Sequence, residues 1–275
     1  MTAMDMPLLP AVATTFEVVA AIVSAVLYLG VGLAAMLRAP RDVRARVFMA
    51  TAVASAAPYS VTVLLWARGA DAAFTLPVMA TVGLSLMLGS LTLFHFAQVF
   101  PWRRPWIAAH WRWLMAGYLL APLALAVPLW LFGPFVQEIA GLSADGSGGL
   151  GAVSVGLPET LVLLLLVVPA LFVLGLVLPF AALLSLYKSW LAAKAAGVRS
   201  ARAATLWILI SQMGGGVLTI LIIPLLHLVA PTGPWATIAA VLLFAFGLLM
   251  PIAFAAGIWK YDVLSLDPDA PPAGL

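Results

Sequence analysis

The sequence predicts an all-α, polytopic membrane protein, built as a bundle of seven transmembrane helices with the N-terminus outside and the C-terminus inside. Three observations lead to this fold class. The 275-residue chain is 65% hydrophobic and 8% charged, with a mean hydropathy of +1.16, whereas a soluble domain is about a quarter charged. It contains seven long apolar stretches, and its basic residues fall in alternate connections between them.

Each apolar stretch is long enough for one membrane span, because about 20 apolar residues in a helix cross the roughly 30 Å hydrocarbon core. The seven predicted helices cover residues 11–37, 47–67, 76–100, 114–132, 160–186, 205–228 and 235–259. We expect them to form one transmembrane domain, residues 1–266. A short proline-rich tail, residues 267–275, follows and is expected on the cytoplasmic side.

The distribution of basic residues fixes the predicted orientation. Twelve of the 13 Lys and Arg residues lie in the connections after the first, third, fifth and seventh stretches, and only Arg68 lies on the other side. Short connections rich in Lys and Arg stay in the cytoplasm. Residues 1–10 contain no Lys or Arg, so we expect the first stretch to be retained as a helix rather than cleaved as a signal peptide. The predicted location is the bacterial inner membrane, crossed several times.

One acidic residue, Glu17, lies well inside an apolar stretch. A lone carboxylate facing lipid is costly, so it should face the bundle and find a partner or stay protonated. Arg68 and His227 are predicted at a compatible depth, and Glu17, Tyr59, Arg68 and His227 together are a candidate polar site on the outer side. The alternative interpretation is that Glu17 reaches the membrane surface or is a neutral packing residue.

Glycines mark candidate helix contacts. Gly214, Gly215 and Gly216 follow one another in the sixth stretch, and Gly89 lies in the third. Small residues let two helix backbones approach closely, so we predict helix packing at these positions. A flexible or lipid-binding notch is the alternative for the triple glycine.

The connection after the third stretch is crowded with tryptophan and arginine. Trp side chains prefer the headgroup level and Arg side chains the cytoplasmic surface, so this group is predicted to anchor the protein at the membrane interface. Its members are Trp102, Arg103, Arg104, Trp106 and Trp111.

Catalytic chemistry finds little support. The chain has no cysteine, its three histidines fall at different depths, and it contains no phosphate-binding loop, zinc-protease motif or nucleophile elbow. We therefore predict no enzyme activity, no metal site and no cofactor, although a bound lipid or other apolar ligand is compatible with the bundle. The basic residues form short clusters between apolar stretches rather than a basic face, so nucleic acid is not an expected partner.

Two segments carry a family resemblance. The third stretch ends in the sequence Leu-Phe-His-Phe-Ala-Gln-Val-Phe-Pro over residues 93–101, and the seventh leads into Gly-Ile-Trp-Lys-Tyr-Asp-Val-Leu-Ser-Leu-Asp over residues 257–267. Both resemble the N-terminal seven-helix membrane region of a class of bacterial sensor histidine kinases. The resemblance implies the same helix count and topology and assigns no ligand site. In such kinases the last helix leads into dimerisation and ATP-binding domains, and we expect neither within residues 267–275. Either the sequence is part of a longer protein, or the module is free-standing and its output lies in another chain.

Two functions fit these expectations. The favoured one is a non-catalytic membrane accessory subunit that packs, among membrane lipids, against other membrane protein subunits of a larger complex, for example a photosynthetic or respiratory one. The alternative is a membrane sensor module that binds an apolar ligand or lipid and signals to a separate kinase-type partner. The low content of polar residues inside the predicted spans favours the accessory subunit.

Overall fold

The computed structural model describes residues 15–68, 72–107, 109–123, 126, 177–217 and 234–270. Within these ranges the regular structure is helical and contains no strand, which confirms the all-α class. The helices are α1 Thr15–Arg38, α2 Val43–Arg68, α3 Ala72–Val99, α7 Leu178–Ala195, α8 Arg199–Val217 and α10 Pro234–Trp259, followed by the 3₁₀ helix η5 Val263–Ser265. Residues 105–107 and 109–123 are also helical.

Membrane association has support from two helices in the described part of the chain. Val18–Arg38 and Ala80–Val99 are long and apolar enough to cross a membrane, judged by length and composition, and Gly247–Trp259 is a shorter apolar helix. The arrangement of seven spans remains a prediction.

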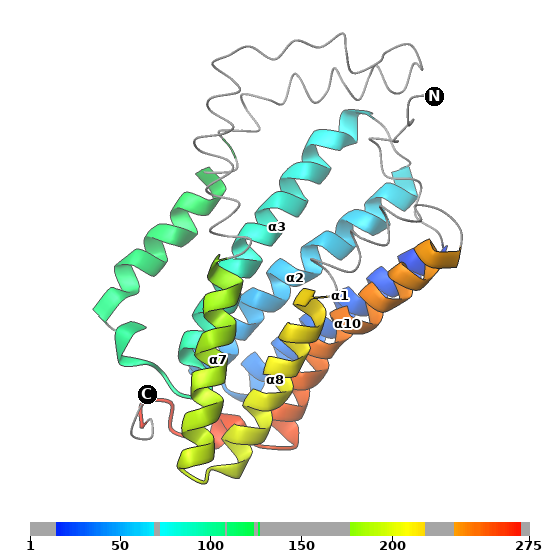
Figure 1. The fold of residues 1–275 in the computed structure, drawn as a ribbon. Coiled ribbons are helices and arrows are strands. Elements are labelled where there is room, and N and C mark those ends of the chain that lie inside the picture. The colour runs from blue at the N-terminus through cyan, green and yellow to red at the C-terminus, as the bar shows by residue number, and fades with distance from the viewer. Residues whose placement is uncertain are drawn as a thin grey trace, which may run out of the picture.

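The six labelled α-helices pack as a closed ring. Helix α1 packs against α2, α2 against α3, α3 against α7, α7 against α8, and α8 against α10, which closes the ring by contacting α1 (Figure 1). The first and last described helices are therefore neighbours, and a change in α1 or α2 can reach the chain segment that follows α10 by direct contact.

Several helices extend beyond the apolar stretches at one end of the bundle. Helix α2 begins at Val43 rather than at residue 47, α7 continues past residue 186 to Ala195, and α8 begins at Arg199 rather than at residue 205. The apolar stretches mark the segment suited to lipid, whereas backbone hydrogen bonding continues into the charged flanks, where Ala, Lys and Arg are strong helix formers.

The turn between α7 and α8 has a definite cause. Gly197 adopts φ +70°, its N–H donates to the carbonyl of Lys194 (3.3 Å), and the N–H of Val198 donates to the carbonyl of Ala193 (3.0 Å). This pair of bonds is the Schellman arrangement, in which a glycine takes the left-handed conformation just after a helix. The turn places Val198 at a fixed position beside the end of α3.

Four phenylalanines fill the interior between α2, α3 and α10. Phe48, Phe96, Phe100 and Phe254 are each fully buried. The rings of Phe48 and Phe254 lie 3.4 Å apart at 18°, and the Phe96 ring meets Phe254 edge-on at 5.4 Å. The same apolar core includes Val263, whose carbonyl belongs to the polar junction described next.

Candidate functional site: a buried arginine junction

Four chain segments meet at one end of the bundle, which we call the basic end. They are residues 39–44 before and at the start of α2, residues 100–104 after α3, the turn 196–198 between α7 and α8, and residues 260–270 after α10. In Figure 1 the α7–α8 turn and the red C-terminal segment lie together at the lower end of the bundle. Segments far apart in the sequence thus share one small region.

Arg44 lies at the centre of this region. Its side chain is 0% exposed, and it pairs with Asp42, whose side chain is 12% exposed. The Nε–H donates to both carboxylate oxygens of Asp42 (3.0 and 3.1 Å), and Nη2 donates to Oδ2 (2.6 Å). Oδ1 of Asp42 also accepts the backbone N–H of Arg44 (2.8 Å), so Asp42 caps the start of α2 as well.

The rest of the Arg44 guanidinium binds backbone carbonyls from two distant segments. Nη1 donates to the carbonyls of Pro101 (2.8 Å) and Val263 (3.0 Å). Nη2 donates to the carbonyls of Leu264 (3.2 Å) and Leu266 (2.8 Å). A buried charge is tolerated only when it is paired and its remaining donors are satisfied. The planar guanidinium meets this requirement because its N–H donors point in fixed directions within one plane. We call this set of contacts the Arg44 junction.

Further bonds hold the segment after α10 across the basic end. The backbone N–H of Arg103 donates to the carbonyl of Pro268 (2.7 Å). Asp262, at φ 47° in the left-handed region, forms an ion pair with Arg38 at 2.8 Å. Both partners of that ion pair are about half exposed, so the ion pair is worth only about 0–1 kcal/mol. The main attachment is therefore the Arg44 junction.

A second polar group ties α3 to α7. The Nη2 of Arg104 donates to the carbonyl of Ser185 (2.7 Å) and to Oγ of Ser189 (3.2 Å), and the amide of Gln98 donates to Oγ of Ser185 (2.7 Å). Burial lowers the pKa of the Arg104 guanidinium from its ordinary value. The predicted surface anchor Arg104 thus joins two helices instead of reaching outward.

The predicted interface anchors divide into two groups. Trp102 is 4% exposed and packs against Ala193 and Ala201, so its assignment as a headgroup anchor is corrected: the chain turns inward after Pro101 and carries the indole under the α7–α8 turn. Arg103, Trp106 and Trp111 are exposed and remain available as anchors.

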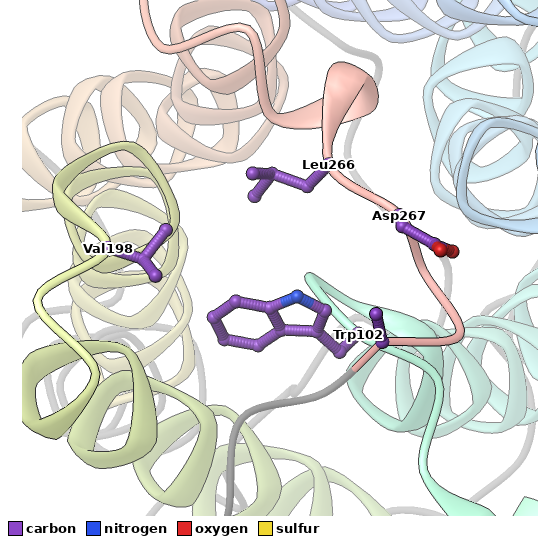
Figure 2. Close-up of a pocket in the computed structure, with 5 residues that line it drawn as sticks. Trp102, Val198, Leu266 and Asp267 are labelled. Atoms are coloured by element: carbon purple, nitrogen blue, oxygen red, sulfur yellow. The ribbon is translucent and has the colours of Figure 1, made fainter.

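A pocket adjoins the junction. Its volume is about 250 Å³, and it is lined by Trp102, Val198, Leu266, Asp267 and Ala270. Figure 2 shows the Trp102 indole facing Val198 and Leu266 across the space, with the Asp267 carboxylate to one side. The lining comes from the segment after α3, the α7–α8 turn and the segment after α10, so its shape depends on how these three pieces are held together.

Of the candidate polar site around Glu17, the structure describes only the surroundings of Tyr59. The side chains of Glu17 and Arg68, and the whole of His227, lie outside the described residues. Tyr59 lies 6.2 Å from the ring of Tyr28, whose hydroxyl donates to the carbonyl of Gly247 (2.8 Å). A small polar group therefore exists between α1, α2 and α10, centred on a tyrosine pair.

Gly247 makes that tyrosine pair possible, since a Cβ placed there would lie 2.5 Å from the Tyr59 hydroxyl oxygen. Gly247→Ala should cost about 1–3 kcal/mol of stability, as overpacking typically does. Gly30→Ala is the control, because a Cβ there meets no described atom within 4 Å. Thermal unfolding of both variants in detergent checks the expectation, and equal melting temperatures would contradict it.

The predicted glycine contacts are placed as follows. Gly214 is half-buried in α8, and the surroundings of Gly215 and Gly216 lie outside the described residues. A Cβ on Gly89 meets no described atom within 4 Å, so the described helices make no close contact there. Close contacts occur instead at Gly247 and at Gly32, where a Cβ would lie 3.0 Å from the Cβ of Ala52.

Sequence reasoning missed Arg44, which it counted as one more cytoplasmic arginine. The local signal was an Asp-x-Arg pair at the start of a helix, in which the aspartate can cap the helix and hold the arginine. Among the described residues no group of three His, Cys, Asp or Glu side chains is arranged to hold a metal ion. The Arg44 junction binds backbone groups and provides no reacting centre.

Comparisons with protein-family models, with curated proteins and with solved structures find no match to this chain.

Proposed function

We propose that this chain is a non-catalytic sensor module of the bacterial inner membrane, which crosses the membrane seven times and signals to a separate kinase-type protein through its basic end. The observation that carries this proposal is the Arg44 junction. It fixes the segment that follows the last helix to the beginning of α2 and the end of α3. Such a connection is what a module needs if a change among its helices is to reach a partner.

The family resemblance supports the same proposal. It rests on residues 93–101 and 257–267, and Nη1 of Arg44 binds a carbonyl from each, those of Pro101 and Val263. The two segments are therefore in one structural unit at the basic end. With the basic end in the cytoplasm, as the positive-inside rule requires, this unit faces soluble signalling proteins.

The interior of the bundle offers a place for the signal to enter. Tyr28 and Tyr59 form a polar pair between α1, α2 and α10 within an apolar surrounding. An apolar ligand or lipid that enters here would separate or rotate helices that also carry Arg44 and the segment after α10. The ligand acts only through a difference in affinity for two arrangements of these helices.

A second candidate function is the accessory membrane subunit favoured by the sequence. Helix α1 presents an exposed apolar face along its whole described length, which includes Val19, Val26 and Leu33 at 54%, 63% and 46% exposure. This face fits lipid and fits the helices of a partner subunit equally well. The accessory role needs no connection between the interior and the basic end, so the Arg44 junction favours the sensor.

The first experiment is purification of the full chain from its own membranes in mild detergent, followed by native mass spectrometry. We expect the protein to carry a soluble signalling partner or a defined apolar ligand. A stoichiometric complex with other multi-pass subunits, lost in harsher detergent, would establish the accessory subunit instead. A bare protein with neither would contradict both functions.

A further inference from the structure

The pocket beside the Arg44 junction has the size and surroundings of a peptide-anchor site. Its volume of about 250 Å³ is below the roughly 300–1,000 Å³ typical of small-molecule pockets. Its lining is mainly apolar, with the indole of Trp102 and the side chains of Val198 and Leu266 (Figure 2). One large apolar side chain from a partner would fill such a space, and interface energy concentrates on anchors of this kind.

The charge around the pocket indicates which residues of the partner should lie next to its apolar anchor side chain. Arg103 directly follows the pocket residue Trp102, and its backbone N–H binds the carbonyl of Pro268. Arg199 and Arg202 lie on the first turn of α8, directly after the pocket residue Val198. All three side chains are exposed. Within the residues that the structure describes, the Arg103 guanidinium pairs only with Asp269, at a long 3.8 Å, so most of this positive charge is open to an incoming partner.

The basic end as a whole also carries a net positive charge. Its connections carry 12 of the 13 Lys and Arg residues, against four aspartates at positions 42, 262, 267 and 269. Asp42 is occupied by Arg44, and Asp262 by Arg38. A partner with acidic residues is attracted to this end and a basic one is repelled, and such complementarity selects partners and speeds association.

We propose that the pocket receives one large apolar side chain from an acidic amphipathic segment of a soluble cytoplasmic protein, with the acidic residues contacting Arg103, Arg199 and Arg202. This inference rests on the proposed function and names the surface through which it operates. The pocket residue Leu266 belongs to the junction, and the pocket residues Asp267 and Ala270 follow it closely along the chain, so a shift of the junction alters the pocket. The segment after α10 thereby takes part both in the Arg44 junction and in binding the soluble partner.

The test is photo-crosslinking in the cell that makes the protein, with the full chain. Asp269→p-benzoylphenylalanine places the crosslinker on the exposed rim without filling the pocket, and Ala109→p-benzoylphenylalanine is the matched control at an exposed position of the basic end that does not line the pocket. We expect position 269, but not position 109, to capture one soluble protein. Mass spectrometry should place the crosslink in a segment that combines Asp or Glu with a large apolar residue.

Two further variants, each combined with the crosslinker at position 269, test the anchor and the charge separately. Ala270→Trp fills the pocket and should lower the crosslink yield about tenfold or more, whereas Ala109→Trp should leave it unchanged. Arg199→Glu together with Arg202→Glu should lower it by a similar factor, about tenfold. Neither Arg199 nor Arg202 takes part in the Arg44 junction, and both side chains are exposed, so the charge reversal tests the proposal even if the filled pocket disturbs the fold.

Several results would overturn the proposal: no crosslink at position 269, crosslinks only to lipid or to this chain, a captured segment without acidic residues, or a yield insensitive to Ala270→Trp and to the charge reversal. Failure of this inference can be told apart from failure of the proposed function. If a soluble partner co-purifies equally well with the Ala270→Trp variant and with the unaltered protein, the pocket is not its binding site, but the proposed sensor function still holds.

Discussion

Arg44→Ala should destabilise the protein by about 3–5 kcal/mol, the usual cost of removing one partner of a buried ion pair. The substitution removes the guanidinium donors that bind the Asp42 carboxylate and four backbone carbonyls, and leaves Asp42 with the backbone N–H of residue 44. Arg44→Lys should recover only part of this loss. An ammonium group has three donors on a flexible stem and cannot replace a planar guanidinium that binds groups from three segments.

The measurement is equilibrium unfolding in mixed detergent micelles, followed by circular dichroism and combined with limited trypsin digestion. Release of the segment after α10 should expose the bond after Lys260, so cleavage there should accelerate in both Arg44 variants. Arg46→Ala is the control, because Arg46 is exposed and its side chain makes one hydrogen bond within the described part of the chain, from Nε to the carbonyl of Pro40 (2.9 Å). Equal stability and equal cleavage in Arg44→Ala and Arg46→Ala would mean that the Arg44 junction does not hold the segment after α10.

The contrast between Arg44 and Arg46 also shows where reasoning from sequence ends. The two arginines are separated by one residue and count equally toward the positive-inside rule. One of them is fully buried and the other exposed. The difference depends on carbonyls that lie 57 and 219 residues further along the chain. Charge counting predicts on which side a connection lies, and it carries no information about such long-range partners.

Tryptophan gives a parallel case. Trp102, Trp106 and Trp111 belong to one connection, and the preference of the indole for the membrane interface treats them alike. Trp102 is buried because the α7–α8 turn and the segment after α10 cover it. The all-α class and the helix order needed only the local apolar pattern, so they could be predicted. The pocket could not be predicted in this way, because it forms only when three segments that are distant in the sequence come together.

Gly89 gives a further case. It was selected because it is small, yet a small residue permits a close contact only where another helix passes it, and none of the described helices does so at Gly89. Gly247 has such a neighbour, because Tyr59 on α2 extends its hydroxyl toward α10. In a helix that is apolar on all sides, the sequence does not show which face meets a neighbour, since lipid and protein interior are both apolar.

Phe254→Ala should lower the stability by about 3 kcal/mol, the lower end of the range measured for Phe→Ala in protein cores. Phe254 is fully buried and stacks on Phe48 at 3.4 Å, while Phe96 and Phe100 contact it from the side. Removing the ring leaves a cavity between α2, α3 and α10, in the same apolar core as Val263 of the Arg44 junction. We therefore expect trypsin cleavage after Lys260 to accelerate as well.

Phe180→Ala is the matched control, because it removes the same type of side chain from an exposed position. Phe180 lies on α7 and is 61% exposed. The comparison separates two sources of stability. If the protein lies in a membrane, the unfolded helices also keep their apolar side chains in lipid, so the transfer from water contributes little and the loss at Phe254 comes from packing contacts. Unfolding in mixed micelles should therefore show a large loss for Phe254→Ala and a change below about 1 kcal/mol for Phe180→Ala. Equal losses of stability in the two variants would mean that the aromatic cluster contributes no specific packing and does not stabilise the Arg44 junction.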